Sequence, residues 1–393
     1  MIIITGAKNF TTKAKICVFI FFLASFILIL GNIYRIVSTT APDFGVLWIS
    51  AKDLVIGKNP YINPALVVPN AYPPVSELFY IPLAFLPYQV SQAIFIFISF
   101  FSIVGAIYLS IKLTFGKVIW PYFLVFMGFA FLSFPTKFSL GMGQINPIVL
   151  FLSLFAYYLE LKNKSVWGGI ILGFSIMLKP IFVFFLLFFA FKKSWKILLV
   201  SLATVFTGIV TTLFFSNPDI WVSWINTGIL PLANLAGREA YCNQGVLGFI
   251  SRIFTNIDVR KYLSGFVSVL LVAFASFYAY KKKGNTLALS LFIITLLFID
   301  TASWQHHFVW LIFPFIVLFS YVVKFKKTVF LELICLAYLL ASWNFKNPSD
   351  FPSIILNNQF YGTLILWALN IYLLYRSRQK EILKTSTIYS KIK

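Results

Sequence analysis

Asp43 is the first acidic residue of the chain, and it follows a long apolar segment directly. It lies near the start of residues 41–86, which also contain the turn-forming clusters GKNPY (57–61) and AYPPVSE (71–77). Clusters of this kind indicate a built loop rather than a flexible tether. A charge at the end of an apolar helix is often only an interfacial cap, but this setting favours Asp43 as the chemical centre.

The two histidines of the chain, His306 and His307, are adjacent in the sequence SWQHHFVW (303–310). Histidine is the side chain whose charge changes most readily near neutral pH, so a pair opposite an aspartate suits proton handling or anion binding. The simpler alternative is hydrogen bonding at a membrane interface. Adjacent histidines do not present two ligands on one helical face, so we expect no cofactor and no metal site, while assistance by a divalent metal stays open.

Further polar side chains lie where lipid would otherwise surround the chain, and charges there are costly unless they face a polar cavity. They are Gln144, Asn146, Lys179, Asn243, Gln244 and Arg252. Each alone can serve as a cap or an interhelical hydrogen bond. Together they supply amide donors and two cations, which suits a lipid-linked phosphate. Aromatic residues crowd membrane interfaces in any case, but four of them complete a candidate substrate cavity with Asn146: Trp48, Tyr61, Tyr72 and Trp304.

Composition places these residues in a membrane. The chain has 393 residues, of which 60% are hydrophobic and 11% are charged, whereas globular domains carry about 25% charged residues. Apolar runs of roughly 15 to 23 residues recur along the whole length, so we expect about ten membrane spans. The first run, residues 16–36, is too long for the core of a cleaved signal peptide. The sequence therefore predicts an all-α polytopic membrane protein with a single integral membrane domain, residues 1–393.

Most of the 32 Lys and Arg residues lie in short clusters between apolar runs. Nucleic-acid binding would need them on a water-exposed domain, so the net charge of +21 reflects the positive-inside rule, with attraction to anionic membrane lipids. This pattern predicts cytoplasmic termini with a basic tail at 376–393. It also predicts outer loops at 38–88, with a short interfacial helix at 76–86, and at 216–261. Most acidic residues fall on the outer side, where we expect the chemistry.

Residues 166–178 and 181–191 flank the pair Lys179-Pro180, and lysines occur at both outer ends of this segment. Each arm of about a dozen residues reaches only ~20 Å as a helix, short of the ~30 Å of a hydrocarbon core. A re-entrant helical hairpin at 166–191 with Lys179 at its tip fits better than one kinked span. The three scattered cysteines predict no disulfide framework.

In their order and spacing, these motifs resemble those of a known family. They are DFGVLW, GKNPY, AYPP, GQIN, Lys179-Pro180, NQGVLGFISR and SWQHH. Residues 43–314 resemble the polyprenyl-phosphate-sugar-dependent glycosyltransferases of glycosyltransferase family 87, in the GT-C superfamily, whose best-known members are mannosyltransferases. The resemblance implies a GT-C-like bundle with short outer-face helices in the cell membrane. The chain departs from the pattern at Gly245, where we would have expected serine.

The resemblance also implies a reaction. Asp43 would be the general base, taking a proton from an acceptor hydroxyl as that oxygen attacks the anomeric carbon of a sugar, mannose or another hexose, on polyprenyl phosphate. One displacement predicts inversion. His306 and His307 would assist, and the donor phosphate would be bound by Lys179, Arg252, Gln144, Asn243 and Gln244. The partners would be the polyprenyl-phosphate sugar and a lipid or glycan acceptor, with no nucleic acid. Asp53 and Glu77 are alternative bases.

Two other functions compete with this interpretation. A secondary transporter or flippase for a lipid-linked or anionic substrate is expected to show an internal repeat with charges near the midplane, and no convincing repeat is visible. A lipid-linked oligosaccharide polymerase or ligase is expected to depend on arginines in a large outer loop.

Overall fold

The computed structural model describes residues 10–64, 66, 70–230, 237–282, 285–325 and 328–390, with side chains to residue 376 except that of residue 215. Within these residues every regular element is a helix, apart from one isolated bridge between Asn243 and Trp304. The predicted all-α polytopic membrane fold is confirmed. Part of the second outer loop, residues 231–236, and the end of the basic tail, residues 391–393, lie outside the described residues.

Long apolar helices form the frame of the bundle. In the described chain, five are long and apolar enough to cross a membrane: α1 (Thr12–Val37), α5 (Tyr88–Phe115), α11 (Trp195–Phe215), α15 (Ile257–Lys281) and η4 (Gln305–Leu311) continued by α17 (Ile312–Phe325). A sixth results if α6 (Trp120–Leu132) and α7 (Phe134–Met142), bent by 64°, count as one span. The bend follows from Pro135, which cannot donate the backbone hydrogen bond that would continue α6.

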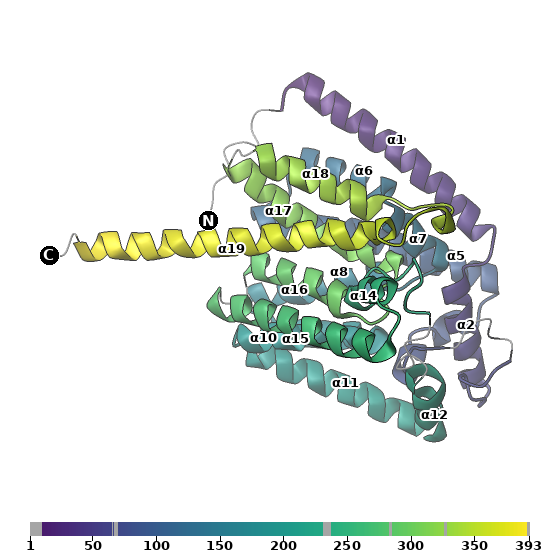
Figure 1. Ribbon diagram of the computed structural model, residues 1–393. Coiled ribbons are helices and arrows are strands. Elements are labelled where there is room, and N and C mark those ends of the chain that lie inside the picture. Colours follow the sequence, from purple (N-terminus) through teal and green to yellow (C-terminus); the bar gives the residue numbers. More distant parts are fainter. Residues whose placement is uncertain are drawn as a thin grey trace.

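Five shorter apolar helices fill the spaces between these long ones. They are α8 (Asn146–Leu161), α9 (Ser165–Leu178), η2 (Pro180–Val183) with α10 (Phe184–Phe191), α16 (Thr286–Ile299) and α18 (Thr328–Ser342). The last helix, α19 (Asn358–Ser390), extends well beyond the bundle (Figure 1). The expected total of about ten spans stays a prediction.

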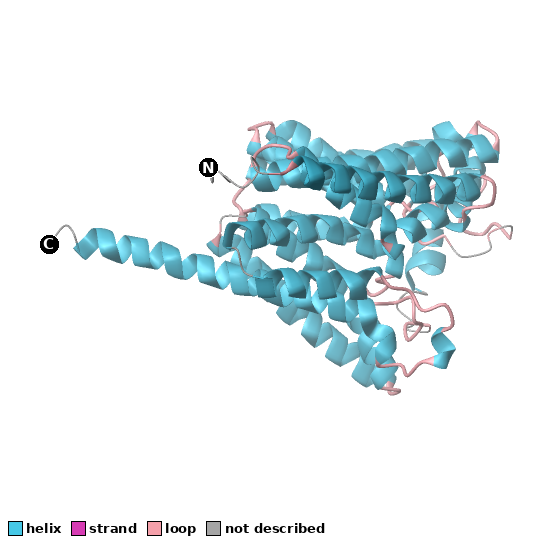
Figure 2. Cartoon of the chain, turned by 90° about the horizontal axis from the view of Figure 1, so that it is seen from above, coloured by secondary structure: helices cyan, strands magenta, loops and turns pink. Residues whose placement is uncertain are grey.

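Short helices gather at the end of the bundle away from the far end of α19, on the right in both views (Figures 1 and 2). They are α2 (Pro42–Val55), α3 (Pro74–Glu77), α4 (Ile81–Ala84), α12 (Asp219–Ser223), the π-helix η3 (Trp224–Ile229), α14 (Val246–Ile253), η5 (Pro348–Asp350) and η6 (Ile355–Asn357). The single interfacial helix expected at 76–86 is divided into α3 and α4, because Pro82 cannot donate the hydrogen bond that would join them.

Lys179 marks the break between α9 and η2. It has an extended backbone, with φ −145° and ψ 99°, because the following proline disfavours helical geometry. The two helical arms predicted around Lys179-Pro180 are therefore present, and their re-entrant placement in a membrane stays a prediction.

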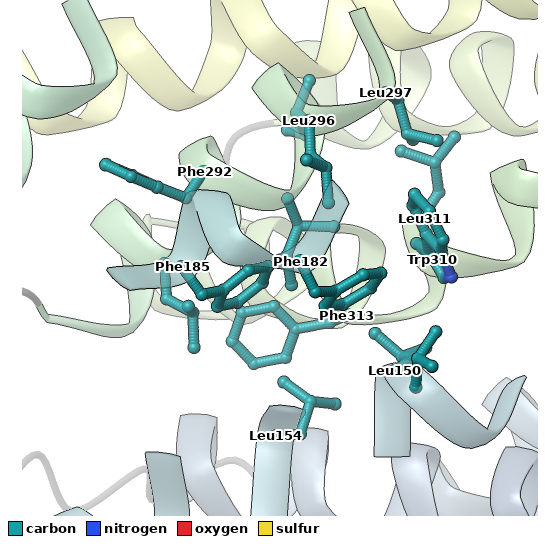
Figure 3. Close-up of a cluster of buried hydrophobic side chains, with 14 of the residues drawn as sticks. Leu150, Leu154, Phe182, Phe185, Phe292, Leu296, Leu297, Trp310, Leu311 and Phe313 are labelled. Atoms are coloured by element: carbon teal, nitrogen blue, oxygen red, sulfur yellow. The ribbon is translucent and has the colours of Figure 1, made fainter. Parts of the chain in front are cut away.

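A cluster of buried side chains joins the helices that carry the polar residues (Figure 3). Trp310 of η4 is fully buried, and its indole N–H donates to the backbone oxygen of Asn146 at 3.0 Å. Phe182 of η2 packs edge-on against the same indole, with ring centroids 4.9 Å apart. The start of α8, η2 and η4 are thus held together next to Asn146, Lys179 and His307.

Candidate active site

Asp43 lies in the first turn of α2, not in the irregular loop that the sequence indicated. Pro42 begins this helix, a position where the missing N–H of proline costs nothing. The carboxylate Oδ2 accepts a hydrogen bond from the side-chain amide of Gln144. The Tyr72 hydroxyl donates to the other end of that amide, Oε1, at 3.0 Å. Tyr61 supports Tyr72 by donating to its backbone oxygen at 2.8 Å.

Gly143 allows this contact by bringing the turn before α8 against α2. It has φ +67°, which favours glycine, and a Cβ built on it would lie 2.5 Å from the Cβ of Phe44. No residue with a side chain fits there without displacing α2. This close approach explains why the second glycine of GMGQINP, Gly143, has no side chain. It sets the position from which Gln144 reaches Asp43.

Lys179 is held by two acceptors from different elements. Its Nζ donates to Oδ1 of Asn146 at 2.8 Å and lies 2.8 Å from Nε2 of His307. Nδ1 of His307 lies 3.1 Å from Oδ2 of Asp300, the residue that ends α16. The imidazole also stacks on Trp310, with centroids 5.1 Å apart and planes at 12°. The orientation of Lys179 is thus set from α8 and from η4.

Asp43 and Lys179 carry opposite charges that attract each other. Burial raises the pKa of Asp43 above its ordinary value, while the Gln144 hydrogen bond and the positive charge of Lys179 oppose this shift. Both side chains are only partly buried, whereas Asp300, His306 and His307 are buried. A base and a cation therefore remain accessible in one polar cluster, which suits acid–base chemistry next to a developing negative charge.

Residues 70–323 match the model of glycosyltransferase family 87. The chain belongs to this family. It is 25% identical over 215 residues to the polyprenol-phosphate-mannose-dependent alpha-(1-2)-phosphatidylinositol mannoside mannosyltransferase of Mycobacterium tuberculosis, covering 53% of this chain and 49% of that protein. It is 26% identical over 137 residues to the alpha-(1->3)-arabinofuranosyltransferase of Corynebacterium glutamicum, covering 34% and 32% respectively. The chain thus spans about half and about a third of these curated relatives.

The two alternative acids in this family 87 chain are placed differently from Asp43. Glu77 is fully buried and accepts a hydrogen bond from Asn70 at 2.6 Å, and burial raises its pKa to about 8. Asp53 lies ten residues further along α2, roughly 15 Å by helical rise, and accepts from Asn63 at 2.5 Å. Neither has the exposed carboxylate that a base acting on substrate needs.

His306 differs from its neighbour because neither of its ring nitrogens has a hydrogen-bond partner among the described residues. Its ring packs against Phe138 at 5.5 Å and against His307 at 4.7 Å between centroids. The Ser139 hydroxyl donates to its backbone oxygen at 2.7 Å, which fixes the chain at this point. Nε2 of His307 is used by Lys179 and its Nδ1 lies near Asp300 without a formed hydrogen bond, whereas both ring nitrogens of His306 have no hydrogen-bond partner among the described residues.

Three residues expected to bind phosphate instead donate to the protein. Gln244 donates to the backbone oxygens of Tyr241 and Leu356. Arg252 donates to Asn357 and to the backbone oxygen of Ala240. Asn243 donates to the backbone oxygens of residues 238 and 301. Phosphate binding by these residues stays a prediction. The structure does not bring their side chains into the polar cluster, which consists of two separate hydrogen-bonded sets: Asp43 with Gln144 and Tyr72, and Lys179 with Asn146 and His307.

The two tryptophans assigned to a substrate cavity also lie outside this polar cluster. The indole of Trp48 donates to the backbone oxygen of Leu83 at 3.1 Å, and Lys52 lies over its ring at 4.2 Å. The Arg238 guanidinium lies 5.8 Å from the ring of Trp304. Tyr61, Tyr72 and Asn146, in contrast, are part of the cluster.

Asp300 is the residue that sequence reasoning missed, since it was counted only as one of the outer acids. The signal was present, because Asp300 is a lone acid at the end of an apolar run, as Asp43 is. In the described part of the chain, no group of three or more His, Cys, Asp or Glu side chains could hold a metal ion.

Proposed function

We propose that this chain transfers a sugar from a polyprenyl-phosphate carrier to a hydroxyl group of a lipid or glycan acceptor, with Asp43 as general base. Membership of glycosyltransferase family 87 supports the reaction class. The activity for which the mycobacterial relative is named supports a polyprenyl-phosphate donor, with mannose or another hexose as the sugar. The observation that carries the proposal is the partly buried Asp43 carboxylate, which is hydrogen-bonded to Gln144 and attracted by the charge of Lys179.

The reaction is a single displacement. Asp43 accepts the proton of the acceptor hydroxyl while that oxygen forms a bond to the anomeric carbon. The bond between this carbon and the phosphate oxygen breaks, and its electron pair remains on the phosphate, so the configuration at carbon inverts. Lys179 neutralises the charge that develops on the departing phosphate. The proton ends on the Asp43 carboxylate. The atoms and charges balance without a cofactor.

The neighbours of Asp43 and Lys179 orient these two groups. Gln144 and Tyr72 fix the direction of the Asp43 carboxylate, and Asn146 with His307 fixes the ammonium group. We assign His306, whose ring nitrogens have no hydrogen-bond partner within the described part of the chain, to hydrogen bonding with the donor. Geometric control of this kind matters because a misplacement of about 1 Å can cost ~10²-fold in rate.

The placement in the cell follows the charge pattern and is part of the proposal. The chain would lie in the cell membrane with both termini in the cytoplasm, and Asp43 would act on the extracytoplasmic side. Cysteine labelling with a membrane-impermeant maleimide tests this orientation, because Asn59→Cys should react from outside in intact cells. Reaction only after permeabilisation would invert the proposed topology.

The decisive experiment compares Asp43→Asn with the matched control Asp219→Asn, which removes an exposed acid at the start of α12. Membranes containing each variant receive radiolabelled polyprenyl-phosphate mannose and total lipid. We expect Asp43→Asn to lower transfer about 10²- to 10⁴-fold, the usual contribution of a general base, and the control to match the unmodified protein. Equal transfer by both variants would remove Asp43 as the base. Absence of transfer from any polyprenyl-phosphate sugar, with substrate uptake into vesicles, would favour a transporter.

A further inference from the structure

We infer that Asp300 is a positioning residue of this site: through His307 it fixes Lys179 in the orientation needed to meet the donor phosphate. The effect of Asp300 on catalysis rests on the proposed function, but the arrangement of Asp300, His307 and Lys179 can be tested without it. Asp300 lies at the end of α16, far in sequence from both Asp43 and Lys179. It acts on Lys179 through the imidazole between them, in addition to a direct attraction between the two charges.

The hydrogen-bonding capacities of these groups allow one arrangement. An ionised carboxylate only accepts, an ammonium group only donates, and a neutral imidazole has one N–H and one accepting nitrogen. Asp300 Oδ2 lies 3.1 Å from Nδ1 of His307, and Lys179 Nζ lies 2.8 Å from Nε2. With Asp300 ionised and Lys179 protonated, we assign His307 the neutral form with its proton on Nδ1, although the Nδ1–Oδ2 contact lacks the geometry of a formed hydrogen bond. The opposite tautomer would place a donor against Lys179 and an acceptor against Asp300.

Asp300 is itself fixed by the turn that follows α16. Its Oδ1 accepts from the backbone N–H of Ala302 at 3.0 Å, which leaves Oδ2 for His307. The loop before α14 packs directly on this turn. The side chain of Asn243 donates to the backbone oxygen of Thr301 at 3.2 Å, and the N–H of Gln244 donates to that of Ser303 at 2.8 Å.

Gly245 makes this packing possible. A Cβ built on it would lie 2.9 Å from the backbone oxygen of Asp300 and 2.9 Å from the Cβ of Ser303. A serine at this position, which the family resemblance led us to expect, has no room while the turn keeps its place. The NQG sequence thus packs against the turn that holds Asp300, and phosphate binding by Asn243 and Gln244 stays a prediction.

The contacts of Lys179 leave one N–H of its ammonium group to donate to a ligand. An ammonium group has three N–H bonds. One is used by Asn146 and one by His307, so one remains for a ligand. If Asp300 no longer holds Nδ1–H, the imidazole can change tautomer, and Lys179 loses one of its two fixed acceptors.

Histidine NMR tests the structural content without any enzyme assay, because the chain has only two histidines. The full-length protein is labelled with ¹⁵N-histidine in detergent, and His307→Gln assigns the signals. We expect His307 to carry its proton on Nδ1, and Asp300→Asn to change the signals of His307 more than those of His306, whose ring lies 4.7 Å from that of His307. The matched control is Asp258→Asn at the exposed start of α15, which should change neither. A proton on Nε2 of His307 in the unmodified protein, or His307 signals unchanged in Asp300→Asn, would overturn the inference.

A double-mutant cycle tests the functional content with radiolabelled polyprenyl-phosphate mannose as the donor. Asp300→Asn should lower transfer about 10- to 100-fold, as loss of a partner that orients a histidine does in other sites. In a His307→Gln background the same substitution should cost less than about twofold, because the intermediary is already lost. Independent, multiplicative losses would overturn the assignment of Asp300 as acting through His307. If the unmodified protein transfers no sugar, the proposed function fails, while the NMR result still decides the tautomer.

Discussion

The side-chain amide of Gln144 donates to the carboxylate of Asp43 and accepts from the hydroxyl of Tyr72, so a single residue links the candidate base to the loop that follows α2. An amide in this place stabilises the ionised form of Asp43 without adding charge. Burial acts in the opposite direction and raises the pKa of Asp43. The ionisation of the base therefore depends on a balance in which Gln144 takes part.

Gln144→Ala should shift the acid limb of the transfer profile to higher pH. The base works only when deprotonated, and its pKa lies above the ordinary 3.8 because of burial. Loss of the Gln144 hydrogen bond removes a contribution that lowers this pKa, so protonation begins at a higher pH. The measurement is transfer rate against pH between 4 and 8. Gln89→Ala, at an exposed position in α5, is the control. A profile that stays in place, or moves to lower pH, would contradict the role of Gln144.

Gly143→Ala should lower transfer about 10²-fold, the cost of a displacement near 1 Å at reacting groups. The added methyl would meet Phe44 at 2.5 Å, and the positive φ adds strain, so the turn and α2 must move apart. Gly57→Ala also places alanine at a positive φ, 73°, but with nothing within 4 Å of the new methyl. This control separates backbone strain from displacement of Asp43. Equal activity of the two variants would show that the close approach is unimportant.

Local patterns in the sequence were enough to predict which residues form most of the polar cluster. Pro42 before an acid, the Lys-Pro break at Lys179 and the turn-forming GQINP each mark a chain feature that neighbouring residues determine. The structure brings Asp43, Gln144, Asn146, Lys179 and His307 together at the helix ends. This grouping could be predicted by assuming only that the helix ends at these residues lie at the same end of the bundle.

The helix α2 shows a pattern that was present but not used. Phe44, Leu47 and Ala51 are fully buried and recur at helical spacing after Pro42, although the segment was interpreted as a loop. The two turn-forming clusters that follow Asp43, and the place of this segment after a membrane span, favoured the loop. The contacts of Asn243, Gln244 and Arg252 were harder to predict, because their acceptors include groups distant in sequence that only the tertiary fold brings near.

Arg252→Lys should reduce stability rather than donor binding. The guanidinium donates through Nε and Nη2 to Asn357 and through Nη1 to the backbone oxygen of Ala240, a set that a lysine cannot reproduce. Leaving Asn357 without this donor should cost about 1 to 3 kcal/mol, measured by thermal unfolding in detergent. The KM for polyprenyl-phosphate mannose should stay within twofold.

Asn357→Ala removes the same interaction from the other side and serves as the partner variant. The two substitutions combined should cost little more than either alone, because they share one interaction. A raised KM for the donor in Arg252→Lys, with unchanged thermal stability, would instead support the phosphate-binding role predicted from the sequence.

Glu77 should make the protein less stable as the pH rises from about 4.5 to about 8. Burial raises its pKa from 4.5 to about 8, so the folded state keeps a proton that the unfolded state releases. The stabilising contribution is complete below the unfolded pKa and is lost as the pH passes through the folded value, with a slope of at most about 1.4 kcal/mol per pH unit. Glu77→Gln keeps the shape and the neutral form, so its thermal unfolding should lose this dependence. The exposed Glu239→Gln should retain it. Parallel curves for the unmodified protein and Glu77→Gln would show that Glu77 is already ionised in the folded state, and would return it to consideration as the base in place of Asp43.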